Sequence, residues 1–329
     1  MKLGAYTACL HDKPLPQALR VLKDLGLNSA EINSGGFLPP VHIPIQDIRK
    51  SATAREDYLG IFKDAGVELT ALNCNGNPLH PDPGVHHADQ LKESIEVAGL
   101  LGVKRLVTMS GTPGTGPEAK LPAWTVIPWD SAYMDARDYQ WGAAIPFWKD
   151  IEARARDNGV YVAIEMHPHN IVYNPATMIR LVEAIDATHV GAEMDPSHLM
   201  WQGCDIIAAM KHLGPIIKCT AAKDVRINEA AKINGVLDDR FTRMPKGTPG
   251  YLSLGGRYEL CKWPENSSWD FVAVGIGNDV NFWAQFIRTT REIDPEIPIN
   301  IEHEDQSMTT LEGLGFAAKT LLDAARSLR

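Results

Sequence analysis

The sequence has few cysteines and no cysteine pair of the kind that binds metal or carries redox chemistry. Its five cysteines are scattered along 329 residues, and no two are spaced as CxxC. This odd, unpaired set argues against a disulfide framework and against a thiolate zinc site. It is typical of a reducing compartment, so we expect a cytoplasmic protein.

Long apolar runs and clusters of positive charge are also missing. No stretch approaches transmembrane length, and the N-terminal segment lacks the apolar core of a signal peptide. The chain has 41 acidic and 32 basic residues, a formal net charge of −9. This charge argues against nucleic acid or an anionic membrane as a partner, and we expect neither.

Two phosphate-binding signatures are absent as well. The first strand-like segment runs into GAYTACLHD, which is not the glycine fingerprint of a dinucleotide-binding sheet. Residues 110–139 contain SGTPGTGP but lack the Lys-Ser/Thr ending of a Walker loop. Neither nucleotide-binding architecture is therefore predicted.

The chain instead shows a regular alternation of strand-like and helix-like segments. Apolar runs predict eight strands, at Lys2–Thr7, Ser29–Ile32, Val67–Cys74, Arg105–Met109, Val160–Met166, Val190–Met194, Ile216–Ala222 and Ile297–Ile301. Amphipathic segments predict the helices between them, at Leu15–Leu25, Thr53–Ala65, Ala88–Leu101, Gly142–Asn158, Asn174–Ile185, Asp205–Leu213, Asp279–Ile293 and Thr310–Leu328.

Eight such alternations predict an α/β protein with a closed (β/α)8 TIM barrel, formed by residues 1–329 as a single domain. An open, doubly wound sheet is the alternative. Two long loops follow the fourth and seventh strands, at 110–139 and 225–274, and the second contains GTPGYLSLGGRY. Loops of this length typically form an active-site lid or an oligomer contact.

Three predicted strands end in an acidic residue with a histidine close behind. They are IEMHPHN (164–170), VGAEMDPSHLMWQG (190–203) and INIEHED (299–305). Catalytic sites of these barrels lie at the carboxyl ends of the strands, so we expect Glu165, Asp195 and Glu302 to meet there. Three carboxylates so close repel one another unless a cation lies between them.

An oxygen-rich ligand set favours a divalent metal, with Mn²⁺ expected and Mg²⁺ or Co²⁺ as alternatives. Without a metal, the same carboxylates would form a network with Lys223 and Arg226. His167 has the same strand parity as Glu165 and is therefore a candidate base or substrate contact.

The C-terminal half resembles the sugar phosphate isomerase/epimerase family, the xylose isomerase-like barrels that also include ketose 3-epimerases and endonuclease IV. The segments that carry the resemblance are IEMHPHNIVYNPATMIRLVEA (164–184), DPSHLMWQGCD (195–205), AAKDVRI (221–227), VGIGNDVNFW (274–283) and IEHED (301–305). The N-terminal half is similar only in its alternation of strands and helices.

The resemblance implies roles for individual residues. It implies that Glu165, Asp195 and Glu302 bind the metal and that the two glutamates act as an acid/base pair. It also implies that His198 contacts the substrate. We further expect Trp201, Lys223, Asp224 and Arg226 to contribute to substrate binding.

One departure from the family pattern concerns the fourth metal ligand. The usual strand-seven motif is His-x-Lys-Asp, but Ala221 stands at the histidine position, and Asn278 replaces a further common histidine. Water, His198 or His167 could complete the ligand set, and Cys219 faces the same side as Ala221. Otherwise the site has changed its chemistry or lost its metal. We expect a retained but weaker metal site.

These features predict a metal-dependent isomerase or epimerase that removes a proton next to the carbonyl of a small carbohydrate through an enediolate. The alternatives are keto-glycoside cleavage, including C-glycoside deglycosylation by the same enolate chemistry, and a metal-less sugar-binding barrel. The expected assembly is a homo-oligomer, with a smaller partner subunit in the cleaving case. DNA phosphodiester hydrolysis is disfavoured by the net negative charge.

Overall fold

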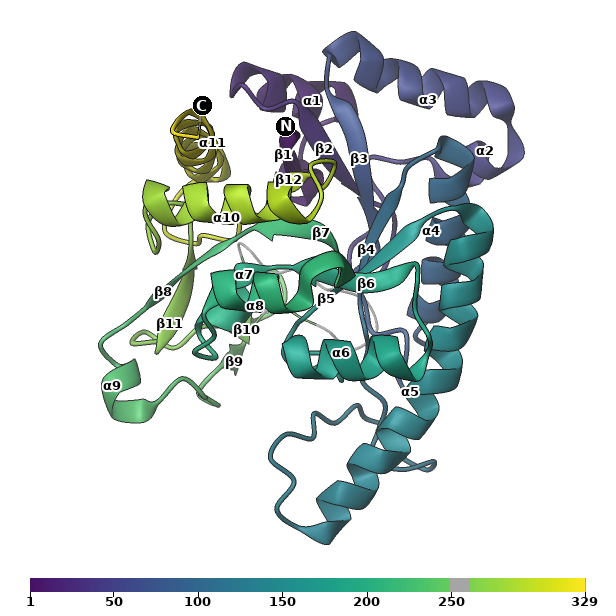
Figure 1. Ribbon diagram of the computed structural model, residues 1–329, viewed down its shortest axis with the longest axis vertical. Coiled ribbons are helices and arrows are strands. Elements are labelled where there is room, and N and C mark those ends of the chain that lie inside the picture. The colour runs from purple at the N-terminus through teal and green to yellow at the C-terminus, as the bar shows by residue number, and fades with distance from the viewer. Residues whose placement is uncertain (249–258, 260, 329) are drawn as a thin grey trace.

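The computed structural model describes residues 1–248, 259 and 261–328. Eight parallel strands form a closed barrel in the order β1-β12-β7-β6-β5-β4-β3-β2 (Figure 1). The strands are β1 (Leu3–Tyr6), β2 (Ser29–Asn33), β3 (Glu68–Asn73), β4 (Arg105–Met109), β5 (Tyr161–Glu165), β6 (Val190–Met194), β7 (Ile217–Ala222) and β12 (Ile299–Ile301). The predicted TIM barrel is confirmed, and each predicted strand matches an observed one.

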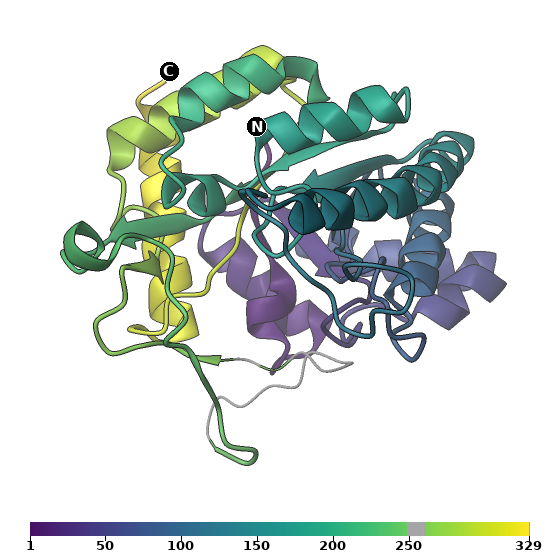
Figure 2. The same ribbon diagram turned by 90° about the horizontal axis from the view of Figure 1, so that it is seen from below.

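Helices follow the strands and cover the outside of the barrel (Figures 1 and 2). The principal ones are α1 (Leu15–Asp24), α3 (Ala52–Ala65), α4 (His87–Leu101), α5 (Ser131–Asn158), α6 (Pro175–Ala184), α8 (Ile206–Leu213), α10 (Val280–Ile293) and α11 (Thr310–Arg326). Capping boxes at Asn174 and Thr309 fix the starts of α6 and α11. The last helix, α11, packs against the first strand, β1.

The helix α5 differs from the prediction because it begins at Ser131, inside the segment expected to be a loop through residue 139. The carboxylate of Asp130 caps this helix by accepting a hydrogen bond from the backbone N–H of Ala132 at 2.8 Å. Most residues in the first two turns are exposed, so the sequence carries no amphipathic pattern there. Two further short helices, α2 (Ile45–Lys50) and α7 (Pro196–Met200), were also not predicted.

The second long insertion contains regular structure that the sequence did not reveal. Strand β8 (Asp224–Ile227) pairs antiparallel with β11 (Trp269–Val272), and β9 (Thr242–Arg243) pairs with β10 (Cys261–Lys262). A short helix, α9 (Ala231–Asn234), follows β8. Figure 1 shows the β8–β11 pair in green, extending from the barrel at the left. Most of the GTPGYLSLGGRY segment lies outside the described residues, at 249–258.

Two kinds of core stabilise the barrel. A large apolar core between strands and helices includes the buried rings of Trp148, Trp283 and Phe286. Inside the barrel, a separate small cluster consists of Ala71, Val107, Ala163 and Cys219. Among the described residues, no helix has the length and hydropathy needed to cross a bilayer.

Candidate functional site

The carboxyl ends of β5, β6 and β12 bring three carboxylates together, as the strand order predicted. Glu165 ends β5, Asp195 follows β6, and Glu302 follows β12 with its backbone N–H donating to the Ala222 carbonyl at 3.1 Å. One oxygen from each carboxylate lies within 4.8 Å of the other two. All three residues are buried, with exposed fractions of 1%, 0% and 9%.

The orientation of Asp195 is set by the start of α7. Its Oδ1 accepts hydrogen bonds from the backbone N–H and the hydroxyl of Ser197, both at 2.8 Å. Its Oδ2 is buried and has no hydrogen-bond donor among the described residues. Since a buried carboxylate oxygen that accepts no hydrogen bond is costly, this atom, which faces His198 and Lys223, fits a ligand position for a cation.

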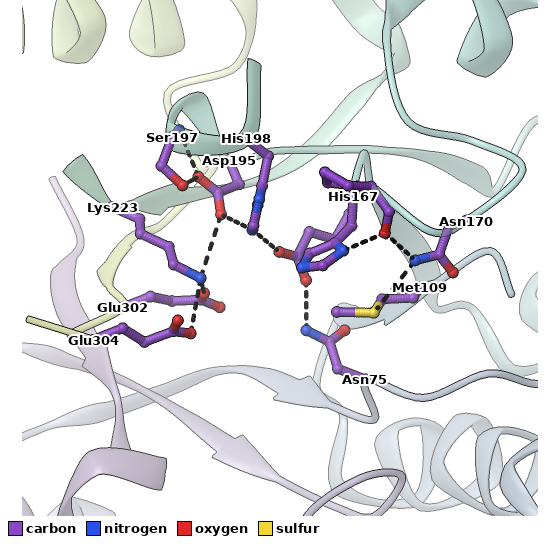
Figure 3. Close-up of polar contacts among 12 residues, drawn as sticks. Asn75, Met109, His167, Asn170, Asp195, Ser197, His198, Lys223, Glu302 and Glu304 are labelled. Atoms are coloured by element: carbon purple, nitrogen blue, oxygen red, sulfur yellow. Dashed lines mark hydrogen bonds and ion pairs between the residues drawn. The ribbon is translucent and has the colours of Figure 1, made fainter. Parts of the chain in front are cut away.

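Two histidine rings lie beside the carboxylates (Figure 3). The Nε2 atom of His198 is 3.2 Å from Glu165 Oε1 and 3.4 Å from Asp195 Oδ2. The His167 ring lies 4.0 Å from the His198 ring, and its Nδ1 is 2.6 Å from the Pro168 carbonyl oxygen. The structure therefore places both predicted histidines in the site.

Lys223 follows β7 and is the buried cation of the site. Its Nζ lies 2.8 Å from Glu304, 3.4 Å from Glu302 and 3.9 Å from Asp195, as Figure 3 shows. The network proposed as an alternative to a metal thus contains Lys223. It does not contain Arg226, whose exposed guanidinium pairs with Asp270 at 3.2 Å.

Burial and charge move the pKa values of these groups in different directions. Burial raises the pKa of Asp195 to about 7. Burial also raises the pKa of Glu302 well above its usual range, although Lys223 opposes this shift. Burial alone would raise the pKa of Glu165, but His198 and Lys223 lower it below its usual range. The carboxylates exceed the nearby positive charge, so the site fits a divalent cation.

The structure adds a site residue that sequence reasoning did not select. The side-chain amide of Asn75 donates a hydrogen bond to Glu165 Oε2 at 2.6 Å. Asn75 follows β3 at the same end of the barrel, so the strand-end rule that selected Glu165 also applies to it. Phe271 could not be found in this way, because β11 brings it in from the insertion, 4.5 Å from Lys223 Nζ and 5.3 Å from the His198 ring.

Asp224 lies outside the cavity that Glu165 and Glu302 line, although it was predicted to contact substrate. Its Oδ2 accepts from the backbone N–H groups of Gly275, Gly277 and Asn278 at 2.9 to 3.1 Å. The Asn278 side chain donates to its Oδ1 at 2.7 Å. We therefore assign Asp224 to holding the segment before α10, with Asn278 as its partner.

The position of the missing family histidine, Ala221, is buried in β7. Cys219 does not replace it, because its thiol lies with Glu31 and Glu193 rather than with the three carboxylates described above. The His198 imidazole, by contrast, lies within 3.4 Å of two of those carboxylates.

Two cavities meet at this site. The first, of about 650 Å³, is lined by Glu165, Glu302, Lys223 and His167 together with apolar side chains such as Phe37 and Trp124. The second, of about 690 Å³, shares Trp124, His167 and His169 with the first. Its other lining residues include the aromatic Trp201, Trp263, Trp269 and Phe271 and the charged Asp238, Asp239 and Arg240. Trp201, which was predicted to contact substrate, lines this second cavity and stacks on Trp269 with ring centroids 5.1 Å apart.

Several solved structures share this fold at low sequence identity. A probable 3-DHS dehydratase, AsbF from Bacillus anthracis, is 14% identical with a TM-score of 0.64, covering 98% of this chain and 99% of that one. The IOLI protein with a bound zinc atom is 18% identical with a TM-score of 0.62, covering 99% of each chain. A D-tagatose 3-epimerase-like protein is 16% identical with a TM-score of 0.60, covering all of both chains. These similarities show the fold.

Sequence comparison gives a nearer relative and a family. YfiH of Bacillus subtilis (strain 168), described as an uncharacterized protein, is 34% identical over 327 residues, which are 98% of each chain. The family model for the xylose isomerase-like TIM barrel matches residues 19–320. The chain therefore belongs to the xylose isomerase-like TIM barrel family.

Proposed function

We propose that this protein is a divalent-metal-dependent isomerase or epimerase that removes and returns a proton next to the carbonyl of a small carbohydrate. The observation that carries the proposal is the pair Glu165 and Glu302, two buried carboxylates that line one cavity beside a third, Asp195. The epimerase and dehydratase titles among the structural neighbours support it by analogy of fold.

The positions of Glu165 and Glu302 suit proton transfer at one carbon. They come from β5 and β12, which two other strands separate, so they approach the cavity from different sides. One carboxylate removes the proton while the other donates one to the opposite face of the carbon. Asn75 and His198 orient Glu165, because they approach different oxygens of its carboxylate.

Glu165, Asp195 and Glu302 would hold the cation. Asp195 Oδ2 supports this assignment, because it is buried and accepts no hydrogen bond from a described residue. When bound, a divalent cation supplies Lewis acidity that increases the acidity of a C–H bond beside a carbonyl. Lys223 adds positive charge next to Glu302, where negative charge develops on the substrate. We propose Mn²⁺, with Mg²⁺ or Co²⁺ as alternatives, because all three ligands are oxygens.

The test is solvent exchange. The protein with Mn²⁺ is incubated with a ketose in D₂O, and deuterium at the carbon next to the carbonyl is followed by NMR. We expect incorporation by the unchanged chain and a loss of at least about a hundredfold in Glu165→Gln, the range of general acid–base catalysis. Glu183→Gln, at an exposed position on α6, is the matched control and should exchange normally. Equal exchange rates in both variants would disprove the role of Glu165.

The aromatic cavity favours a second candidate, the cleavage of a keto-glycoside. It adjoins the carboxylates across His167, and its size and its tryptophan and phenylalanine side chains suit an aromatic group of a two-part substrate. Asp238, Asp239 and Arg240 also line it and would contact polar substituents of that group. Proton removal next to the keto group would then be followed by loss of the aglycone. Incubation with a 3-keto-glycoside distinguishes the candidates, since aglycone release without exchange of a free ketose supports cleavage. A chain that binds no Mn²⁺ and catalyses neither reaction would instead be a sugar-binding barrel.

A further inference from the structure

Glu165, Asp195 and Glu302 lie at the carboxyl ends of the strands and together form the mouth site. A second group of metal-ligating side chains lies deeper inside the barrel. Glu31 on β2, Glu193 on β6 and Cys219 on β7 each offer one ligand atom, and these atoms lie within 4.8 Å of one another. Glu193 precedes Asp195 by two residues, so it faces the same interior, about 6.6 Å further down the strand. The deeper group is therefore a separate layer of the barrel.

Glu193 has no partner that would explain its burial. It is fully buried, and neither carboxylate oxygen has a hydrogen-bond partner among the described residues. Glu31 differs, because its two oxygens accept from the side-chain amides of Asn73 at 2.8 Å and Asn300 at 3.1 Å. An ionised Glu193 would lack a cation, and a neutral one would lack an acceptor for its proton, so either form is costly without a ligand.

The two carboxyl groups of this layer have no side-chain cation as a direct partner among the residues that the structure describes. Within the described part of the chain, no lysine or arginine forms an ion pair with Glu31 or Glu193. Lys223 pairs with Asp195, Glu302 and Glu304 in the layer above. The charge of Arg105 favours the thiolate form of Cys219, but its guanidinium donates to the Lys218 carbonyl and pairs with Asp294.

The side chains around this layer are small. Ala71, Val107 and Ala163 form a buried cluster with the Cys219 thiol. Bulky branched side chains usually fill the interior of such barrels. These small side chains leave a buried position in the barrel interior that two carboxyl groups and a thiol make polar.

We propose that Glu31, Glu193 and Cys219 form a second cation site, which binds a thiophilic divalent ion such as Zn²⁺, Co²⁺ or Cd²⁺. A thiolate ligand selects these ions over Mg²⁺ and Mn²⁺, whereas the mouth site offers only carboxylate oxygens and imidazoles. Binding releases the thiol proton to solvent, because the thiolate is the ligand. The proposal does not depend on the catalytic activity of the mouth site.

The test is titration of the metal-free chain with Co²⁺, followed by absorption and by elemental analysis. A cysteine ligand gives a thiolate-to-cobalt charge-transfer band in the near ultraviolet, which a site made only of oxygens and imidazoles cannot give. We expect this band on titration with Co²⁺. Each chain should bind two equivalents of Co²⁺ but, in a separate titration, one equivalent of Mn²⁺. Cys219→Ser should lose the band and one equivalent of Co²⁺, and Glu193→Gln should weaken binding at the same site.

Two variants separate the sites. Cys9→Ser changes the thiol that lines the mouth cavity and should leave the band intact. Asp195→Asn should remove the mouth equivalent but keep the band, so failure of the mouth site does not affect this readout. A single equivalent of every metal, or a band that survives Cys219→Ser, would overturn the proposal. An anomalous difference map from a cobalt-soaked crystal of the unchanged chain checks the position without any substitution.

Discussion

Replacing Lys223 by methionine separates a metal site from a self-sufficient ion-pair network. The ammonium lies 3.4 Å from Glu302 and 3.9 Å from Asp195, both proposed metal ligands. At an effective dielectric constant of about 20, each such pair has a Coulomb energy of about 4 kcal/mol before desolvation is counted. Removing one partner of a buried ion pair typically destabilises a protein by about 3–5 kcal/mol.

We therefore expect Lys223→Met to lower the free energy of unfolding of the metal-free protein by about 3–5 kcal/mol. Its affinity for Mn²⁺ should rise, because a positive charge that competes for the same carboxylates is gone. A gain of about 1.4–2.8 kcal/mol corresponds to a tenfold to hundredfold lower dissociation constant. Mn²⁺ should consequently raise the melting temperature of the variant more than that of the unchanged chain.

The measurements are calorimetric titration with Mn²⁺ and thermal unfolding with and without the metal. Lys218→Met is the control, because Lys218 is a half-buried lysine of β7 whose ammonium donates to the Pro215 carbonyl instead of a carboxylate. Its Mn²⁺ affinity should match that of the unchanged chain. Unaltered or weaker Mn²⁺ binding by Lys223→Met would refute the reasoning, and an unchanged chain that binds no Mn²⁺ would favour the ion-pair network.

Two further substitutions test how the site is supported. Glu152 accepts hydrogen bonds from the backbone N–H groups of Thr188, His189 and Val190, which outweigh burial and lower its pKa below 4.5. This stabilisation is present above pH 4.5 and is lost as the pH falls through the folded pKa. Glu152→Gln should lower the free energy of unfolding at pH 7 by about 1.5–3 kcal/mol in denaturant titrations and weaken its pH dependence in acid. Equal stability of the variant and the unchanged chain at pH 7 would contradict this. Gly36→Ala places a Cβ 2.1 Å from the Asn75 carbonyl oxygen at a φ of +85°. The variant should therefore exchange the substrate proton for deuterium more slowly and melt at a lower temperature. An unaltered rate of deuterium exchange would show that Asn75 is dispensable.

The barrel and the meeting of Glu165, Asp195 and Glu302 were predictable because they depend on period and order. Apolar runs mark strands, and parallel strands of a closed barrel end on the same side. The start of α5 was not predictable, because its first turns are largely exposed and leave no apolar stripe. Phe271 was missed for a different reason, since only the pairing of β8 with β11 brings it to the site.

Asp224 shows where strand-end reasoning fails. A carboxylate after a strand can face a ligand or satisfy backbone N–H groups, and the sequence looks the same in both cases. Here three backbone N–H groups within residues 275–278 donate to it, and their position depends on the course of the insertion. The deeper group at Glu31 and Glu193 was also not predicted, because both residues lie inside their strands and not at the carboxyl ends where a site was expected.

The two oxygens of the Asp195 carboxylate have different environments, and this difference affects how an ion binds and dissociates. One oxygen is held by the first turn of α7, so the other keeps its direction whether or not a ligand is present. Little reorganisation is then needed on loading, and the affinity is not reduced by the cost of ordering this ligand. A chelator should accordingly remove the metal ion from the mouth site reversibly. The barrel should remain folded and bind a different ion on dialysis.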